Sequence, residues 1–548
     1  MQIKPIIETS VKRRNIFIVY TLLIISACTT KEKQFSGAQV FRYNEHSNIT
    51  SLDPAFARDQ RNIWAVHQLF NGLVQLDDSL LVQPDIAKQW TISEDGKIYQ
   101  FLLRDDVFFH EHERFGKHKT RKVTASDVAY SLGRLKDPKV ASPGRWVLQH
   151  VKEYSVVNDS TFTIELNQPF PPFLGLLSMK YCSVVPQEIV EFYGKDFRSN
   201  PIGTGPFKFK LWVENTKLVF RKNENYYEVD SKGEKLPYLE ALAITFLPDK
   251  QSEFLQFIQG NIDFMKSLDA SYKDEILSNT GKLKEKYSNS IDMQKGAYLN
   301  TEYLGFYLDV EKDYPTQSKL IRKAMNYGFD REKMITFLRN NVGSPALNGF
   351  IPKGLPSFSN AKGYIYNPQK AKQLIEKFKN STGEQTINVT ITTNSNYLDL
   401  CEFIQRELQS IGLNVIVEVV LPSTLRQGKA NGKLPVFRAS WIADYPDAEN
   451  YLSLFYSKNF TPNGPNYTHF KNELFDQLYE ESIKQTKNSK RFELYRKMDS
   501  ILIEEAPVIP LYYDEVIRFS QKNVKGLGIN PIDLLTLKGV RKEKVKKK

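Results

Sequence analysis

A strand–helix–strand succession between residues 386 and 420 constrains the fold more than any other feature of this sequence. Residues 386–392 (TINVTIT) and 413–420 (LNVIVEVV) are typical of strands, and residues 396–411 between them are typical of a helix that ends at Gly412. Two strands joined by a helix lie parallel, and a parallel sheet needs cover on its faces. The sequence therefore predicts an α/β fold.

The length of the chain predicts more than one globular unit. A single hydrophobic core stops growing at roughly 250–300 residues, and this chain has 548. The first half alternates predicted helices at 61–73, 124–135 and 250–260 with predicted strands at 98–103, 161–166 and 217–222. A second unit begins near residue 298, and its predicted helices lie at 315–327, from Asn367-Pro368 onward, at 471–485 and at 488–504. We expect at least two α/β lobes and find no internal repeat.

The N-terminus indicates export. A basic cluster, Lys12-Arg13-Arg14, precedes ten apolar residues (16–25), and then come Ser26, Ala27 and Cys28. This order is typical of a secretory signal peptide, and ten apolar residues cover only about half of the hydrocarbon core as a helix. The segment Ile25-Ser26-Ala27-Cys28 resembles the bacterial lipobox, which implies cleavage after residue 27 and lipidation of Cys28. An ordinary signal peptide with an incidental cysteine is the alternative. Residues 28–36 then form a lipid-anchored tether.

Charge and cysteines exclude two classes of protein. The formal net charge is +12, but residues 538–548 contribute +6 and residues 1–27 contribute +3, so the remaining body is near neutral. No basic stripe interleaved with aromatic residues indicates nucleic-acid binding. Three cysteines cannot form a paired disulfide framework, and Cys182 and Cys401 are expected to be buried, inert thiols.

Few motifs indicate catalysis. The sequence has no G-x-S-x-G elbow, P-loop or H-E-x-x-H motif. His110, His112 and His118 form the one metal-like cluster, but the polar stretch 110–122 favours a solvated loop. Gly203-Thr204-Gly205-Pro206 is typical of a tight turn before a strand.

Three carboxylates lie close together in the segment 441–450 (WIADYPDAEN). Asp444, Asp447 and Glu449 allow three interpretations: a glycosidase pair, a Ca²⁺ loop, or a carboxylate that meets a ligand cation. A buried carboxylate needs a paired charge, and a ligand ammonium can supply it.

An ordered set of short motifs resembles one protein family over residues 40–520. The motifs are SLDPA (51–55), NGL (71–73), PDIA (84–87), VTASDV (123–128), GTGPF (203–207), NYY (225–227), GNID (260–263), RKAMN (322–326), WIAD (441–444) and APVIPLY (506–512). Together they resemble bacterial extracellular solute-binding proteins of family 5, the peptide- and nickel-binding group of ABC importers. The resemblance implies a periplasmic-binding-protein-like, class II fold of the large type, with a cleft between two lobes that two hinge strands join.

The resemblance also implies domain boundaries. Lobe I would comprise residues 35–297 plus 508–540, with an inserted subdomain at about 62–185, and lobe II would comprise residues 298–507. Residues 541–548 would form a basic tail. Hinge closure around the ligand is the expected motion.

The resemblance further implies a ligand site. In peptide-binding members the aspartate of a W-x-x-D motif pairs with the ligand's N-terminal ammonium, and Asp444 occupies that position here. Trp441 belongs either to the core or to the cleft, and Tyr445 is a further candidate. Family members bind the ligand backbone by strand-like hydrogen bonds. Residues 392–396 (TTNSN) lack the arginine of dipeptide-selective members, which argues against a strict dipeptide preference.

We therefore predict a monomeric solute-binding protein, not an enzyme, that is lipid-anchored on the extracytoplasmic side of the cell envelope and captures peptides for ABC permease subunits. No cofactor or metal is expected. The alternatives are the same module with a metal chelate, glycoside or other small solute, and a secreted hydrolase that uses Asp444 and Asp447.

Overall fold

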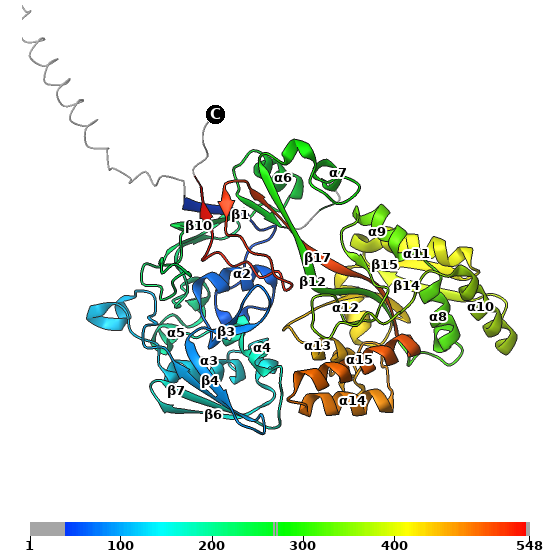
Figure 1. Ribbon diagram of the computed structural model, residues 1–548, viewed down its shortest axis with the longest axis horizontal. Helices are drawn as coiled ribbons and strands as arrows, with labels where there is room; N and C mark the ends of the chain where they lie inside the picture. Colours follow the sequence, from blue (N-terminus) through cyan, green and yellow to red (C-terminus); the bar gives the residue numbers. More distant parts are fainter. Residues whose placement is uncertain (1–38, 267–268, 270–271, 544–548) are drawn as a thin grey trace, which may run out of the picture.

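The computed structural model of the protein describes residues 39–543 apart from 267, 268, 270 and 271. The predicted signal peptide, Cys28 and the tether lie outside these residues, as does most of the basic tail. In the described part, no helix is both long and apolar enough to cross a membrane. The chain folds into two lobes, which two long strands join (Figure 1).

A mixed sheet of eleven strands runs through both lobes. Its main path is β15-β14-β16-β12-β17-β11-β1-β10-β9-β8, and β13 (Ser344–Pro345) pairs with β17 at the side. The central strands β12 (Ile291–Phe306) and β17 (Val508–Gln521) are antiparallel and pair along most of their length. Their first and last paired residues lie in different lobes, so these two strands are the connection between the lobes.

Lobe I is built on the strands to one side of this pair. They are β1 (Val40–Asn44), β8 (Phe207–Val213), β9 (Lys217–Lys222), β10 (Ala241–Thr245) and β11 (Phe264–Lys266). The helices α2 (Gln60–Leu69), α5 (Gln187–Tyr193), α6 (Lys250–Ile258) and α7 (Lys273–Ile276) belong to this half of the chain. Side chains of α2 pack with those of β1 and β10 in one apolar core, with Trp64, Leu69 and Phe41 fully buried.

A second sheet is inserted into lobe I, and we call it, with its helices, the insert. Its strand order is β4-β5-β7-β6, all antiparallel. The elements are β4 (Ala87–Ile92), β5 (Ile98–Leu103), β6 (Val151–Asn158), β7 (Thr161–Leu166), α3 (Ala125–Lys136) and α4 (Phe173–Leu177), with the hairpin β2 (Val74–Leu76) and β3 (Val82–Pro84) beside them. Helix α3 begins after Thr124, one residue later than the predicted start at 124, and the backbone N–H of Thr124 donates to the Asp127 carboxylate at 2.9 Å.

Lobe II contains the predicted strand–helix–strand unit. Strands β14 (Asn388–Thr393) and β15 (Asn414–Val419) are parallel, as the sequence predicted, and α11 (Leu398–Ser410) joins them. The remaining elements are β16 (Val436–Ile442), α8 (Lys319–Tyr327), α9 (Arg331–Arg339), α10 (Pro368–Thr382), α12 (Pro422–Ala430), α13 (Glu449–Leu452), α14 (Glu473–Lys484) and α15 (Asn488–Glu505).

Two helix starts in lobe II show the value and the limit of capping signals. Asn367 caps α10, and its side chain accepts from the backbone N–H of Lys370 at 2.9 Å, as predicted. The helix predicted to begin at Pro315 begins instead at Lys319. Residues Pro315–Gln317 form a separate 3-10 turn, and the hydroxyl of Ser318 caps the helix proper.

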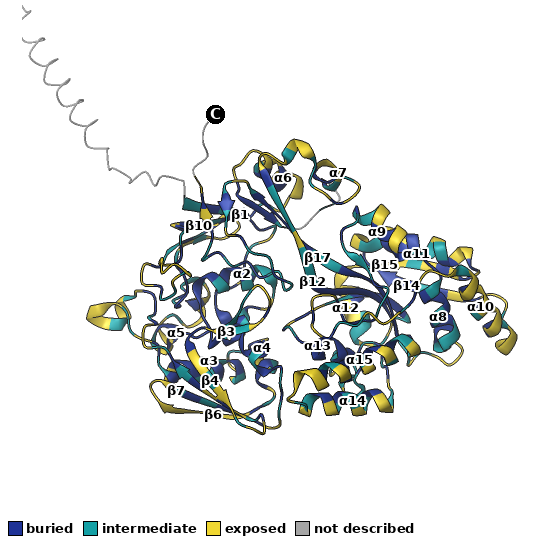
Figure 2. Cartoon of the chain, viewed as in Figure 1, coloured by how far each residue is buried: buried dark blue, intermediate teal, exposed yellow. Residues whose placement is uncertain are grey.

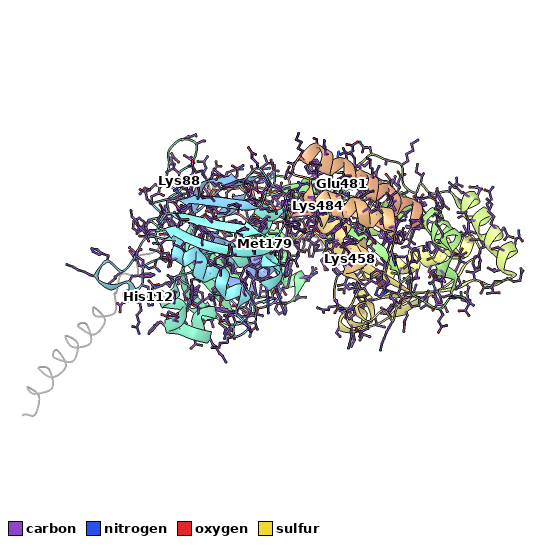
Figure 3. The ribbon with its side chains drawn as sticks, turned by 90° about the horizontal axis from the view of Figure 1, so that it is seen from below. Lys88, His112, Met179, Lys458, Glu481 and Lys484 are labelled. Carbon is purple, nitrogen blue, oxygen red and sulfur yellow. The ribbon has the colours of Figure 1, made fainter. Side chains whose placement is uncertain are left out.

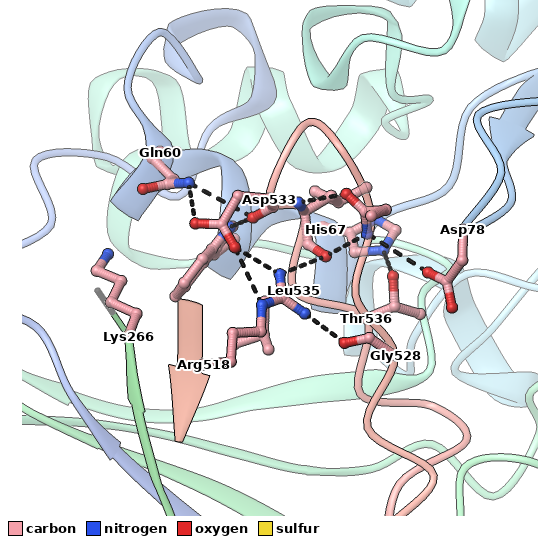
Figure 4. Close-up of polar contacts among 12 residues, drawn as sticks. Gln60, His67, Asp78, Lys266, Arg518, Gly528, Asp533, Leu535 and Thr536 are labelled. Atoms are coloured by element: carbon pink, nitrogen blue, oxygen red, sulfur yellow. Dashed lines mark hydrogen bonds and ion pairs between the residues drawn. The ribbon is translucent and has the colours of Figure 1, made fainter. Parts of the chain in front are cut away.

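Buried residues follow the sheet and the inner helix faces, and exposed residues are frequent on the outer faces of helices such as α10 and α14 and on the outer strands of the insert (Figure 2). The segment after β17 returns across lobe I, where β18 (Val524–Lys525) and β19 (Arg541–Lys542) pair. Figure 4 shows how this return is fixed. Arg518, 1% exposed, donates to Asp533 at 2.8 Å and to the Gly528 carbonyl at 2.6 Å, and Gln60 donates to the other Asp533 oxygen at 2.8 Å. An ion pair with a buried arginine and a largely buried aspartate thus ties the end of the chain to lobe I.

Candidate functional site

A cavity of about 690 Å³ lies where the insert meets lobe II. The insert contributes Trp146, Gln149, His150, Gln168, Phe170 and Leu176 to its wall. Lobe II contributes the rest, from the end of β16 to helix α14. This part of the wall includes Trp441, Asp444 and Tyr445, so the three residues predicted to bind ligand line one cavity.

The insert and lobe II are in direct contact at the cavity wall. The rings of Trp146 and Tyr445 have centroids 6.5 Å apart, and Tyr445 is buried in the apolar core of the insert although it belongs to lobe II. Lys458 and Lys484 lie on the lobe II side of the junction, and Met179 lies on the side of the insert (Figure 3). A ligand here would touch both parts of the molecule.

Asn450 holds the aspartate in place. Strand β16 ends at Ile442, and the backbone N–H of Ala443 donates to the Leu299 carbonyl of β12 at 2.9 Å. The Asn450 amide oxygen accepts from the backbone N–H of Asp444 at 3.1 Å and from Trp441 Nε1 at 2.9 Å. The Asn450 amide nitrogen donates to the Asp444 carboxylate at 3.2 Å. Sequence reasoning missed Asn450, because a spacing of six residues through a turn has no periodic signal.

The Asp444 carboxylate opens to the cavity and has no countercharge. Its side chain is exposed on the cavity side, and no salt bridge joins it to any residue that the structure describes. Protein atoms surround it on the other sides, and this desolvation raises its pKa, while the hydrogen bond from Asn450 lowers it in part. A cation placed in the cavity would favour the ionised form and find an unpaired partner.

Trp441 shares its face of β16 with apolar neighbours. It is half-buried, packs against the apolar core of lobe II and still lines the cavity. Trp441 therefore packs on the core and also faces the cavity, while its part in ligand binding stays a prediction.

Tyr445 contributes its ring rather than its hydroxyl. The hydroxyl donates to Glu449, and so does the hydroxyl of Tyr479 from α14. Glu449 is 5% exposed, and burial raises its pKa to about 7, although the two tyrosine bonds lower it.

Asp447 has a structural partner. Its carboxylate lies 3.0 Å from Arg491 Nη2 of helix α15, and both residues are buried. The backbone N–H of Glu449 also donates to Asp447, at 3.0 Å. An aspartate neutralised in this way is not free for the hydrolase alternative, which requires two carboxylates facing a substrate.

The three histidines of the segment 110–122, predicted to lie in a solvated loop, have different surroundings. His110 is buried, not solvated, because its ring nitrogens bond to the backbone of Gly203 at 3.3 Å and Gly205 at 3.0 Å. Burial lowers the pKa of His110 to about 4. His112 lies 3.0 Å from the Tyr193 hydroxyl, and His118 is exposed. Among the described residues, no three side chains of metal-binding type gather at one point.

An arginine does reach the start of α11, although none lies in residues 392–396. Arg438 of β16 lies over the ring of Tyr397, next to α11, and forms an ion pair with Glu302 of β12. Both members of the pair are buried. Glu302 neutralises this guanidinium, so it is not a free anion site.

Comparisons with known proteins agree over most of the chain. Residues 82–463 match the family described as bacterial extracellular solute-binding proteins, family 5 Middle. The dipeptide-binding protein DppE of Bacillus subtilis (strain 168) is 25% identical over 531 residues, which cover 92% of each chain. The glutathione-binding protein GsiB of Salmonella typhi is 24% identical over 492 residues, covering 88% of this chain and 91% of its own.

A solved structure has the same architecture. The periplasmic binding protein DppA from Helicobacter pylori, in complex with the peptide STSA, superposes with a TM-score of 0.76 at 26% identity. The match covers 92% of this chain and 98% of that one.

Proposed function

Because this chain belongs to the bacterial extracellular solute-binding proteins of family 5, we propose that it captures peptides and delivers them to the permease subunits of an ABC importer. The family consists of solute-binding proteins and not of enzymes. Dipeptide-binding DppE and peptide-bound DppA are similar to this chain over most of its length, and this likeness supports a peptide cargo. Oligopeptides are the proposed class, and the mature protein is proposed to act as a monomer.

The observation that carries the proposal is the unpaired Asp444 in the wall of the cavity. A peptide's N-terminal ammonium is the cation proposed to meet it, with Trp441 and the Tyr445 ring beside it. A carboxylate that loses its counterion inside a complex costs about 3–5 kcal/mol, so this pair would dominate affinity.

A free strand edge beside Asp444 supports binding of the peptide backbone. Strand β16 pairs with β12 from Val436 to Ile442, but with β14 only at Val436 and Phe437. In the described part of the chain, no strand covers the other edge of residues 438–442. An extended peptide could add there by main-chain hydrogen bonds, which recognise any sequence.

The proposed lobes meet at this cavity. Lobe I is proposed to comprise residues 35–297 plus 508–540, with lobe II at 298–507, and closure would occur about β12 and β17. The cavity takes its wall from both sides of that junction, which is where a closing ligand site must lie.

The anchor is a separate part of the proposal. Lipidation at Cys28 would hold the protein on the extracytoplasmic side of the membrane, near its permease. Metabolic labelling with a radioactive fatty acid should mark the native chain and not the Cys28→Ser variant; equal labelling of both would remove the anchor from the proposal.

Calorimetric titration of matched peptides tests the cargo. Trialanine with a free amine should bind the wild type, and N-acetyl-trialanine should bind at least about 100-fold more weakly, since one ion pair of about 3 kcal/mol is lost. Asp444→Ala should remove the difference between the two peptides. Equal binding of both peptides by the wild type would contradict the ammonium pairing.

Native mass spectrometry of the gently purified protein tests the cargo class without choosing a ligand. Bound masses that fragment into peptide ladders are expected. A single fixed mass that yields no peptide fragments would transfer the proposal to a non-peptide solute.

A further inference from the structure

The cavity wall has the composition of a site for positive charge. Besides Asp444 it contains two more carboxylates, and it is rich in aromatic rings. The aromatic residues are Trp146, Phe170, Trp441, Tyr445, Tyr456 and Tyr479. Cations bind favourably over aromatic faces, and the interaction grows when the cation is desolvated. One terminal ammonium at Asp444 uses only part of this wall.

Glu449 is the second acidic group of the inner wall. It is 5% exposed and lines the cavity, and both of its oxygens already accept from Tyr445 and Tyr479 hydroxyls. A carboxylate has about four acceptor positions, so two tyrosine donors leave room for a further donor. No salt bridge to Glu449 is formed within the described residues, because Arg491 pairs with Asp447 instead.

The cations of the cavity lie at its rim. Lys458 is 71% exposed and pairs with Glu480 at 2.7 Å, so these two charges cancel. Lys484 is exposed on α14, and Figure 3 shows both lysines at the junction of the lobes. Rim charges in contact with water are screened and weak. The inner wall therefore presents two carboxylates, Asp444 and Glu449, that form no salt bridge with any described residue, and the cation near Glu449, Arg491, is already paired with Asp447.

We propose that this cavity selects cargo with a second positive charge, a lysine- or arginine-type side chain that Glu449 receives while Asp444 holds the terminal ammonium. The inference rests on the proposed peptide function and names a substrate class for the same site. Tyr445 and Tyr479 position the Glu449 carboxylate, and their rings, with Trp146, surround the incoming cation.

The ionisation of Glu449 supports the selection. Burial raises its pKa to about 7, so the carboxyl group is only partly ionised at neutral pH. A bound cation favours the ionised form and compensates the desolvated charge, whereas a neutral side chain of the same length leaves that charge unpaired.

A pair of peptides that differ in one charge tests this on the wild-type, full-length protein. Lys-Ala-Ala and norleucine-Ala-Ala share the free amine and the four-carbon stem, and only lysine has the second ammonium. Titration calorimetry at pH 7.5 should show at least about tenfold tighter binding of the lysine peptide, a difference of about 1.4 kcal/mol. Equal or tighter binding of the norleucine peptide would overturn the inference and leave peptide capture standing. If neither peptide binds, peptide capture itself fails, and this inference fails with it.

A variant assigns the preference to Glu449. In Glu449→Gln the affinity ratio between the two peptides should approach one, while Glu481→Gln, an exposed change on α14, should keep the wild-type ratio. A wild-type ratio in Glu449→Gln would overturn the role of this residue. If that variant does not fold, the wild-type peptide pair still decides whether the selection exists.

Discussion

Asp533 in lobe I and Asp444 in the cavity wall are both partly desolvated carboxylates with a raised pKa, yet their partners differ completely. Asp533 accepts from Arg518 and Gln60, and its side chain is 13% exposed. Asp444 has a single side-chain donor, Asn450, and faces the cavity. The first carboxylate is satisfied by the protein itself and stabilises the fold. The second carboxylate, Asp444, has no cationic partner among the described residues and is available to a cation of a bound ligand.

The largest expected effect is the loss of the buried ion pair in lobe I. Arg518→Met should lower the free energy of unfolding by about 3–5 kcal/mol, because the Asp533 charge stays buried without its partner. Urea unfolding followed by circular dichroism measures this. Adding Asp533→Asn to Arg518→Met should recover part of the loss, since no charge is then left unpaired. Asparagine suits this position, where φ is +51°.

Asp444→Ala is the contrasting variant. It removes no ion pair among the described residues, so unfolding should need as much urea as in the wild type or slightly more. A loss comparable to that of Arg518→Met would show that Asp444 is a structural residue, and it would contradict the distinction between Asp444 and Asp533.

A second prediction concerns pH and Glu449. Its folded-state pKa of about 7 lies above the ordinary 4.5, so the folded protein holds this proton more tightly than the unfolded chain does. Raising the pH from 4.5 to 7 therefore favours unfolding through this group, by on the order of 3 kcal/mol. Below 4.5 both states hold the proton, so stability no longer changes with pH through this group, and the stabilisation that is lost at pH 7 is fully present.

Thermal melts of the wild type and Glu449→Gln across this pH range check the sign. The wild-type melting temperature should fall relative to the variant between pH 4.5 and 7, while Glu480→Gln, at the exposed rim, should run parallel to the wild type. The groups around Glu449 are Tyr445, Tyr479, Asp447 and Arg491. Parallel wild-type and Glu449→Gln curves would show that the folded protein does not hold this proton.

A smaller effect is expected at Asn450, which positions Asp444. Asn450→Ala removes one hydrogen bond to a charged group and two to its neighbours, so free-amine peptides should bind about tenfold more weakly. Asn463→Ala, the same change at an exposed position of the same cavity, should alter affinity less than about twofold. Equal losses in the two variants would mean that Asn450 has no special part in holding the carboxylate.

The sequence predicted the elements whose signals are local. The strand–helix–strand unit of β14, α11 and β15 and the Asn367 cap of α10 depend on neighbouring residues, and both were found where expected. The start of α8 was displaced because Pro315 begins a separate turn and Ser318 provides the better cap.

The candidate site divides in the same way. Asp444, Trp441 and Tyr445 were named from a motif of adjacent residues, and the structure places all three in one wall. The pairing of Asp447 with Arg491 and the approach of Trp146 to Tyr445 join segments far apart in the chain. Such contacts depend on how the helices and the insert pack, and no local sequence pattern predicts them.

The smallest expected effect separates exposed ion pairs from buried ones. Lys458 and Glu480 lie as close together, at 2.7 Å, as Arg518 and Asp533 at 2.8 Å, so distance alone would rank the two pairs equally. The lysine is 71% exposed, whereas the arginine is 1% exposed. In water the attraction is weak and offset by side-chain entropy, so Lys458→Met should change the free energy of unfolding by less than about 0.5 kcal/mol. Urea unfolding at low and high salt measures it. A loss above about 2 kcal/mol would mean that the rim of the cavity is less hydrated than its exposure indicates. The positive charges of Lys458 and Lys484 would then partly offset the negative charge of the inner wall.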